Sequence, residues 1–338
     1  MIPEEISLDE EKIAFRRDHY GDERFEFVKV LARGGQGYAL LVEDKWCGGR
    51  AVLKGLWWDS SLFRDESWRN GLDRSKVRQQ QGLKAVYRAM QLTQQAPSVI
   101  DVLVEESPTL EARGITPRDD EYFVVTEFVG IPGKPVRTLE NEIMDRHDKM
   151  RSFTEDELID LAEQLCGALA ALHAPRRGRR GDEYWIHADL KPENVLVLGP
   201  PAQYVLIDYD AAVVRGEFIG TTTLDYSPPV PPGADLSTER DSASEKFDIY
   251  MLGTTLAHAL TLARLDEQTK RNFYGTFHEH TAEKQRLAEY GLSPILTTLI
   301  ASCLADVEFR TRNVQSILTD LARAREGAVL SSVLLGEK

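Results

Sequence analysis

The chain is poor in cysteine and in long apolar runs, and each shortage excludes a class of protein. Its 338 residues include only three cysteines, at positions 47, 166 and 303, without the close spacing of a metal motif. We therefore expect reduced, packed thiols in a cytoplasmic protein rather than disulfides or metal ligands. No apolar run is long enough to cross a bilayer, and the acidic start of the chain does not resemble a signal peptide.

Positive charge is also scarce. Against 41 Lys and Arg stand 55 Asp and Glu, which gives a formal net charge of -14 at pH 7. This balance argues against broad binding to nucleic acid or to a membrane surface. A local exception is "APRRGRRGDEYW", whose four arginines lie between Arg176 and Arg180. We interpret them as a solvated insertion, with docking of an acidic substrate or partner as the alternative.

The patterns along the chain predict two unequal lobes. Residues 1–24 are charged and predict a loosely held acidic arm. Within 25–129 the segments "FEFVKVLA", "YALLVE", "RAVLKGL" and "EYFVVTEF" predict strands. One helical pattern, "SKVRQQQGLKAVYRAMQL", interrupts them. Its apolar residues near one face are Val77, Leu83, Val86, Tyr87 and Met90.

From residue 130 to 326 the patterns are helical, and 327–338 would form a tail. The segment "SFTEDELIDLAEQLCGALAALHA" has a capping box, Thr154 with Glu157, at its start. "EKFDIYMLGTTLAHALTLA" is apolar almost all round, which predicts a buried helix. Strands first and helices later predict an α+β fold of two lobes with a cleft between them.

The stretch "YWIHADLKPENVLVLGPPAQYVLIDYD", residues 184–210, holds the densest candidate chemistry. Two apolar runs flank a Gly-Pro-Pro turn, so an antiparallel hairpin would bring Asn194 and Asp208 to one end. An amide oxygen and a carboxylate are hard ligands that suit magnesium. Asp189 could accept a hydroxyl proton, and Lys191 could neutralise phosphate charge. Together these residues favour phosphoryl transfer.

Two features of the first lobe would complete such a site. The turn "RGGQG" contains Gly34 and Gly37, and glycine lets backbone N–H groups approach phosphate oxygens. Lys54 ends the segment "AVLK" on a predicted strand. Facing inward it would need an anion, and facing outward it would be an ordinary surface lysine. The alternation along 51–54 does not decide between the two.

These motifs, in order from about residue 25 to 325, resemble those of eukaryotic-type Ser/Thr protein kinases. "HADLKPEN" is similar to the catalytic loop H-R-D-L-K-P-E-N, "AVLK" to V-A-I-K, "LARGGQG" to the glycine-rich loop and "IDYD" to the D-F-G region. Downstream, "GTTTLDYSPP" resembles the end of an activation segment, "FDIYMLG" a buried helix motif and "CLADVEFR" a late arginine motif. The resemblance implies a bilobal kinase fold, ATP and Mg²⁺ as cofactors, and Ser/Thr hydroxyls of proteins as acceptors.

The resemblance also implies roles for single residues. Lys54 would hold the α- and β-phosphates, and Asp189 would orient the acceptor hydroxyl and take its proton. Lys191 would steady the γ-phosphate. Asn194 and Asp208 would bind magnesium.

Further residues would frame the nucleotide or belong to the activation segment. Those around the nucleotide are Leu31, Ala32, Gly34, Gly37, Ala39, Val52, Thr126, Glu127, Val129 and Leu196. Among them, Ala39, Val52 and Leu196 would sandwich the adenine ring. Thr126 would be the gatekeeper, with backbone groups of Glu127 and Val129 facing the adenine edge. In the activation segment, Thr221 would pair with Asp189 and Lys191, and Thr222 and Thr223 would be autophosphorylation sites.

Several letters depart from the kinase pattern. Ala188 replaces the arginine that would pair with an activation-loop phosphate, which predicts activity independent of that phosphate. Tyr209 and Asp210 replace Phe and Gly. We expect the Tyr209 hydroxyl to find a partner and Asp210 to stiffen the segment, because Asp tolerates a positive φ less well than Gly. Pro229 replaces a glutamate, so Arg310 must find another carboxylate or lie free.

The helix glutamate that should pair with Lys54 is missing from its expected place. Glu66 or one of Gln79, Gln80 and Gln81 could serve, and the sequence does not choose among them.

Two other interpretations stay open. "HADLKPENVLV" followed by "LIDYDAA" also resembles aminoglycoside and choline phosphotransferases, in which Asp210 could help in the metal site. The degraded motifs suggest an ATP-binding pseudokinase scaffold. Retention of Lys54, Asp189, Asn194 and Asp208 argues against that scaffold, because binding alone has no chemical need for all four.

Overall fold

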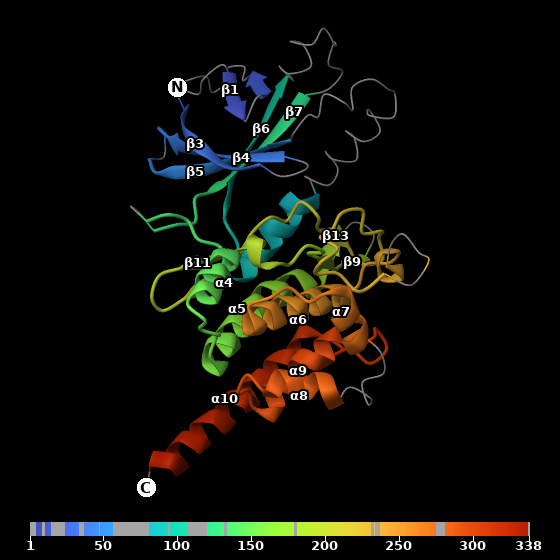
Figure 1. Cartoon of the computed structure of the whole chain (residues 1–338). Helices are drawn as coiled ribbons and strands as arrows, with labels where there is room; N and C mark the ends of the chain where they lie inside the picture. Colours follow the sequence, from blue (N-terminus) through green and yellow to red (C-terminus); the bar gives the residue numbers. More distant parts are fainter. Residues whose placement is uncertain are drawn as a thin grey trace. The chain divides into compact units, whose positions relative to one another are not determined.

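The computed structural model divides the chain into two compact units (Figure 1). The N-terminal unit comprises residues 1–83 and 97–129, and the C-terminal unit comprises residues 84–96 and 130–338. The structure describes residues 5–8, 11–14, 24–33, 37–46, 48–56, 81–93, 95–106, 120–131, 134–178, 181–230, 233, 237–274 and 281–336.

The N-terminal unit is built on a five-stranded antiparallel sheet in the order β3-β4-β5-β7-β6. Its strands are β3 (Phe25–Arg33), β4 (Gly37–Asp44), β5 (Arg50–Leu56), β6 (Val99–Glu106) and β7 (Asp120–Glu127). The four predicted strands are confirmed as β3, β4, β5 and β7, whereas β6 was not predicted. A separate hairpin of β1 (Glu5–Leu8) and β2 (Glu11–Ala14) lies within the expected arm.

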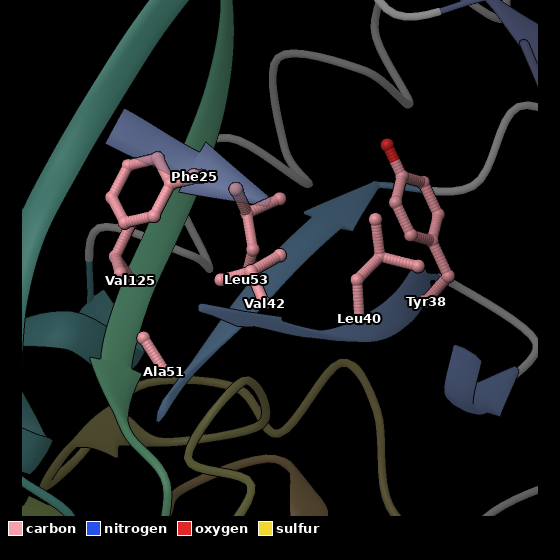
Figure 2. Packing of buried hydrophobic residues seen from close by; sticks show 7 residues of the cluster. All are labelled: Phe25, Tyr38, Leu40, Val42, Ala51, Leu53 and Val125. Carbon is pink, nitrogen blue, oxygen red and sulfur yellow. The ribbon is translucent and has the colours of Figure 1, made fainter. Parts of the chain in front are cut away.

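One face of this sheet carries the core of the unit. Figure 2 shows the cluster along the strands that carry it, and its members are Phe25, Tyr38, Leu40, Val42, Ala51, Leu53 and Val125. Side chains alternate across a strand, so Ala51 and Leu53 enter this core while Val52 and Lys54 lie on the opposite face.

The helix predicted to interrupt the strands is described over 81–92. Of the residues predicted near one face, Val86 is buried, Leu83 and Met90 are partly buried, and Tyr87 is 38% exposed. The small residues Ala85 and Ala89 are also buried. Val77 lies outside the described residues.

The C-terminal unit is mainly helical. Its helices are α4 (Leu139–Asp148), α5 (Glu155–His173), α6 (Glu245–Thr261), α7 (Glu267–Tyr274), α8 (Thr281–Ala288), α9 (Pro294–Leu304) and α10 (Val314–Gly336). The capping box of Thr154 and Glu157 is present at the start of α5. Every residue of α6 from Phe247 to Leu260 is buried, as its apolar pattern predicts. Helix α6 packs against α5 and α9, and α10 packs against the same two helices (Figure 1).

Three small antiparallel pairs complete this unit. The predicted hairpin consists of β11 (Val195–Leu198) and β12 (Gln203–Leu206), and β10 (Trp185–Ile186) pairs with β13 (Val213–Val214). The arginine-rich insertion forms β8 (Arg176–Gly178) and β9 (Gly181–Glu183). Arg176 and Arg177 are paired in register with Glu183 and Asp182, so acids oppose the described arginines. Arg179 and Arg180 lie outside the described residues.

Two of the cysteines are buried free thiols, as predicted. Burial raises the pKa of Cys303 to about 12 and also raises the pKa of Cys166. Cys47 lies outside the described residues. In the part of the chain that the structure describes, no helix has both the length and the apolar character that crossing a bilayer requires.

Candidate active site

A buried carboxylate on α6 holds the chain at residues 187 and 188. Asp248 is 0% exposed, and its two oxygens accept the backbone N–H groups of His187 and Ala188, each at 2.8 Å. His173 Nε2, at the end of α5, lies 2.9 Å from Asp248 Oδ2. Ala188 has a φ of 62°, a left-handed conformation that costs an alanine about 1 kcal/mol. Two hydrogen bonds to a charged acceptor offset this cost and direct the chain into residue 189.

Asp189 lies at the centre of a compact polar cluster. Lys191 Nζ donates to Asp189 Oδ2 at 2.8 Å, and the N–H of Thr223 donates to Oδ1 at 2.8 Å. Asn194 Nδ2 donates to the Asp189 carbonyl at 2.8 Å and to Oδ2 at 3.1 Å. The structure therefore brings Asp189, Lys191 and Asn194 together, and it fixes both carboxylate oxygens.

The threonine in this cluster is Thr223. Its Oγ1 accepts from Lys191 Nζ at 2.7 Å in addition to the N–H bond to Asp189. We predicted these contacts for Thr221, so the structure corrects the register by two residues. Thr222 faces a different neighbour, since its Oγ1 lies 4.0 Å from Met251 Sδ on α6.

Asn194 and Asp208 lie at the same end of the β11–β12 hairpin. Val195 pairs with Leu206, and the N–H of Ile207 donates to the Asn194 carbonyl at 2.8 Å. Asp208 follows directly with a φ of 63°. Non-glycine residues rarely adopt this left-handed conformation, and those that do are concentrated at functional sites.

The donor set at this end fits a magnesium ion. The Asn194 amide nitrogen is turned toward Asp189, so its Oδ1 is the oxygen that can face a cation. Among the residues that the structure describes, no group of three or more His, Cys, Asp or Glu side chains could hold a metal. A divalent ion on Asn194 and Asp208 would take its other ligands from water or bound phosphate, as magnesium commonly does.

His187 and Tyr209 pack against each other beneath this cluster. Their rings are 4.7 Å apart at an interplanar angle of 65°, an edge-to-face contact. Burial lowers the pKa of His187, so its ring is neutral, and Nδ1 accepts the Asp189 N–H at 3.2 Å. Tyr209 packs as expected, but its buried hydroxyl has no hydrogen-bond partner in the described part of the chain, so that expectation was wrong. The positive φ also falls on Asp208 rather than on Asp210.

Two buried arginines, Arg240 and Arg310, form contacts near residues 219–220 and 239 of the C-terminal unit. Arg240 donates to the carbonyls of Ile219 at 2.9 Å and Gly220 at 3.0 Å. Arg310 forms a bidentate pair with Glu239, at 2.7 and 3.0 Å, in which their side chains are 0% and 7% exposed. Arg310 has thus found another carboxylate. Sequence reasoning missed Glu239 and Arg240, because nothing in the polar run "STERDS" marks them as buried.

Strand register places five of the predicted nucleotide residues of the N-terminal unit on one face of its sheet. Lys54 pairs with Ala39, which pairs with Ala32, and Val52 pairs with Thr126. Residues directly opposite each other share a face, and so do residues two apart along a strand. Lys54 therefore faces away from the hydrophobic core, together with Val52.

The remaining predicted nucleotide residues have mixed surroundings. The Glu127 N–H donates to the Ser98 carbonyl at 2.8 Å, so this backbone donor is already engaged. Leu31 and Val129 are partly buried in the N-terminal unit. Leu196, on β11 of the C-terminal unit, is 7% exposed. Gly37 begins β4, whereas Gly34 lies outside the described residues.

The partner of Lys54 stays a prediction. Glu66, Gln79 and Gln80 lie outside the described residues, and Gln81 is the first described residue of the 81–92 helix.

Comparisons with known proteins indicate the family of this chain. The chain is similar to the serine/threonine-protein kinase PknD of Chlamydia pneumoniae, with 24% identity over 328 residues, which cover 90% of this chain and 31% of the relative. It is similar to PknD of Chlamydia felis, with 22% identity over 329 residues, 90% of this chain and 31% of the relative. For PknD of Chlamydia trachomatis serovar D the figures are 24% over 271 residues, 71% and 25%.

The chain therefore spans about a third or less of the length of these curated relatives. A family model described as the protein kinase domain matches residues 90–320, more than half of the chain. The match includes the Asp189 cluster, the β11–β12 hairpin and Asp248. This protein belongs to the protein kinase family.

Proposed function

We propose that this chain transfers the γ-phosphoryl group of ATP to serine or threonine hydroxyls of protein acceptors. The observation that carries the proposal is the Asp189 carboxylate, held at Oδ1 by the Thr223 N–H and at Oδ2 by Lys191 Nζ. A carboxylate fixed in this way can orient an acceptor hydroxyl and take its proton. The names of the curated relatives support the same acceptor class.

The other residues of the cluster would manage phosphate charge. Lys191 Nζ, which reaches both Asp189 and Thr223, would neutralise charge on the transferred group. Asn194 Oδ1 and Asp208 would hold Mg²⁺, which supplies charge neutralisation when bound. Lys54 would hold nucleotide phosphates, which accounts for a lysine on the sheet face that lacks the hydrophobic core. In this proposal the N-terminal and C-terminal units are the small and large lobes of the kinase fold.

We also propose that activity does not depend on phosphorylation of the activation segment. Ala188 offers no guanidinium for a phosphate. Instead, Arg240 holds the carbonyls of Ile219 and Gly220, and Thr223 binds Asp189 and Lys191 directly. Phosphatase-treated protein, verified by mass spectrometry, should keep its transfer rate. Complete loss of activity after treatment would contradict this proposal.

The main test is transfer from labelled ATP with magnesium, with and without a generic basic protein acceptor. Wild-type protein is compared with Asp208→Ala, Asp189→Asn and the control Asp320→Ala, whose side chain is 43% exposed. Label on serine or threonine that disappears in the first two variants supports the proposal. ATP binding without transfer to any acceptor would indicate a pseudokinase scaffold. Transfer only to a small metabolite would indicate a small-molecule phosphotransferase.

A further inference from the structure

We infer that Arg264 is a positioning residue for the acceptor side of the active site, an inference that rests on the proposed function. Arg264 lies in the connection between α6 and α7 and contacts three carboxylates. Its Nη2 donates to Glu140 Oε1 at 3.0 Å and to Glu193 Oε1 at 2.6 Å, and its Nη1 donates to Asp225 Oδ2 at 3.3 Å.

These acids come from three segments that lie around Asp189. Glu140 is in α4, and Glu193 is in the short helix η2 (Pro192–Asn194) that ends at the asparagine bonded to Asp189. Asp225 lies two residues after Thr223, whose N–H also binds Asp189. One guanidinium therefore joins the two sequence segments that hold the carboxylate proposed to receive the acceptor proton.

The guanidinium also balances the negative charge of this group. Glu140 and Glu193 each have an Oε2 atom that is buried without a hydrogen-bond partner among the described residues. Two further basic groups face these acids. His258 on α6 has its Nδ1 3.8 Å from Glu140 Oε2 and 2.8 Å from the Tyr226 hydroxyl, and the charge of Lys191 acts on Glu193. Without Arg264, three carboxylates would repel one another across a partly buried site. Such repulsion would displace η2 and the segment around Asp225.

Arg264 and Lys270 also contact residues 224–226, which follow Thr223. The Arg264 guanidinium carbon lies 5.8 Å from the centroid of the Tyr226 ring. Lys270 Nζ on α7 donates to the Leu224 carbonyl at 3.0 Å. These contacts fix residues 224–226, and through them Thr223, against α7 and the connection that precedes it.

A positioning role can be separated from a general stabilising role. The Arg264 side chain is 45% exposed, and ion pairs at such positions contribute little to global stability. The planar guanidinium of Arg264 has several N–H donors in fixed directions and can bind several carboxylates, whereas the ammonium group of a lysine is a single point charge. Arg264→Lys should therefore keep part of the positioning function, whereas Arg264→Ala should lose it.

The kinetic test compares the full chain with Arg264→Ala, Arg264→Lys and Arg323→Ala. Arg323 is the matched control, because its side chain is 67% exposed and forms an ion pair with Asp320 at 3.2 Å. Arg264→Ala should lower kcat/KM for a protein acceptor by about 10- to 100-fold while nucleotide affinity stays unchanged. Arg264→Lys should recover part of the loss. An Arg264→Ala variant that matches Arg323→Ala in kcat/KM would overturn the inference.

A second measurement tests the inference without a transfer assay. If the wild-type protein transfers no phosphate, only the proposed function is contradicted, and this measurement still applies. Hydrogen exchange of peptides containing Thr223 reports on its N–H bond to Asp189. Arg264→Ala should speed this exchange and Arg323→Ala should not, whereas equal protection in both variants would overturn the inference. Adding Glu140→Gln should reduce the effect of Arg264→Ala, because the two side chains are in contact and their effects are not additive.

Discussion

At the scale of single residues, the site depends on polar side chains that have specific partners. Asp248 accepts two backbone N–H groups, and Asp189 accepts from a lysine, an amide and a backbone N–H. Each buried carboxylate therefore has several donors, as burial of charge requires. Loss of one donor should change the position of the carboxylate more than it changes the stability of the fold.

Thr223 provides the first prediction. Thr223→Ala removes the oxygen that accepts from Lys191 at 2.7 Å, so Lys191 Nζ becomes less well fixed and phosphoryl transfer should fall about 10-fold. The free energy of unfolding should change by only about 1 kcal/mol. Steady-state transfer assays and urea denaturation measure the two quantities. Thr222→Ala is the control and should keep nearly full activity, and the reverse ranking would show that the register is wrong.

At the scale of elements, the C-terminal unit depends on one close helix crossing. Gly253, in α6, faces α9, and a Cβ atom built on it would lie 2.6 Å from Cys303 Cβ. This distance is too short for two carbon atoms, so any larger residue would push the helices apart. The glycine is thus required by packing rather than by backbone conformation.

Gly253→Ala should accordingly destabilise the fold by about 1–3 kcal/mol. Gly327→Ala is the matched control in α10, where no atom of the described residues lies within 4 Å of the added Cβ. That change should be neutral or stabilise by about 0.5–1 kcal/mol, because alanine favours helix. Denaturant midpoints of both variants test the prediction. A decrease of the same size in both would mean that the crossing is looser than the distance implies.

An ion pair between Arg146 of α4 and Glu157 of α5 predicts that the stability of the fold depends on pH. Two hydrogen bonds from Arg146 at 2.8 Å are the main reason that the pKa of Glu157 falls from 4.5 to about 2. Because the folded-state pKa is depressed, the stabilisation is fully present above pH 4.5 and is lost as the pH falls toward 2. Glu157→Gln should keep the capping bond to Thr154 but flatten this part of the stability curve.

Urea unfolding between pH 3 and 6 measures this dependence, with Glu289→Gln as an exposed control. The wild type and the control should lose stability together on acidification, while Glu157→Gln should lose less. Parallel curves for all three proteins would argue against the Arg146–Glu157 pair as the source.

At the scale of the whole molecule, ligand binding should be visible as stability. A nucleotide that binds only the folded chain stabilises it by about 2.7 kcal/mol at 100 times its Kd. We therefore expect ATP with magnesium to raise Tm by a few degrees in thermal unfolding. The shift should shrink with EDTA and in Asp208→Ala, because that carboxylate and Asn194 are the proposed magnesium ligands. If ATP with magnesium raised Tm equally in the wild type and in Asp208→Ala, Asp208 would not be a magnesium ligand.

The sequence by itself determined the features that depend on short-range order. The strand patterns, the α5 capping box and the buried α6 were readable because alternation, helical period and end signals lie within a few residues. The β11–β12 hairpin, with Asn194 and Asp208 at one end, followed from two apolar runs and a turn in the same way.

Only the tertiary structure decided contacts between distant segments. It selected Thr223 over Thr221, paired Arg310 with Glu239 across 71 positions, and left the Tyr209 hydroxyl without a hydrogen-bond partner in the described part of the chain. It also placed Lys54 opposite the core, which alternation alone left open. The physical reason is that local patterns specify the period and the ends of an element. Which face is buried, and which charge meets which, depends on segments that fold against each other from far apart in the chain.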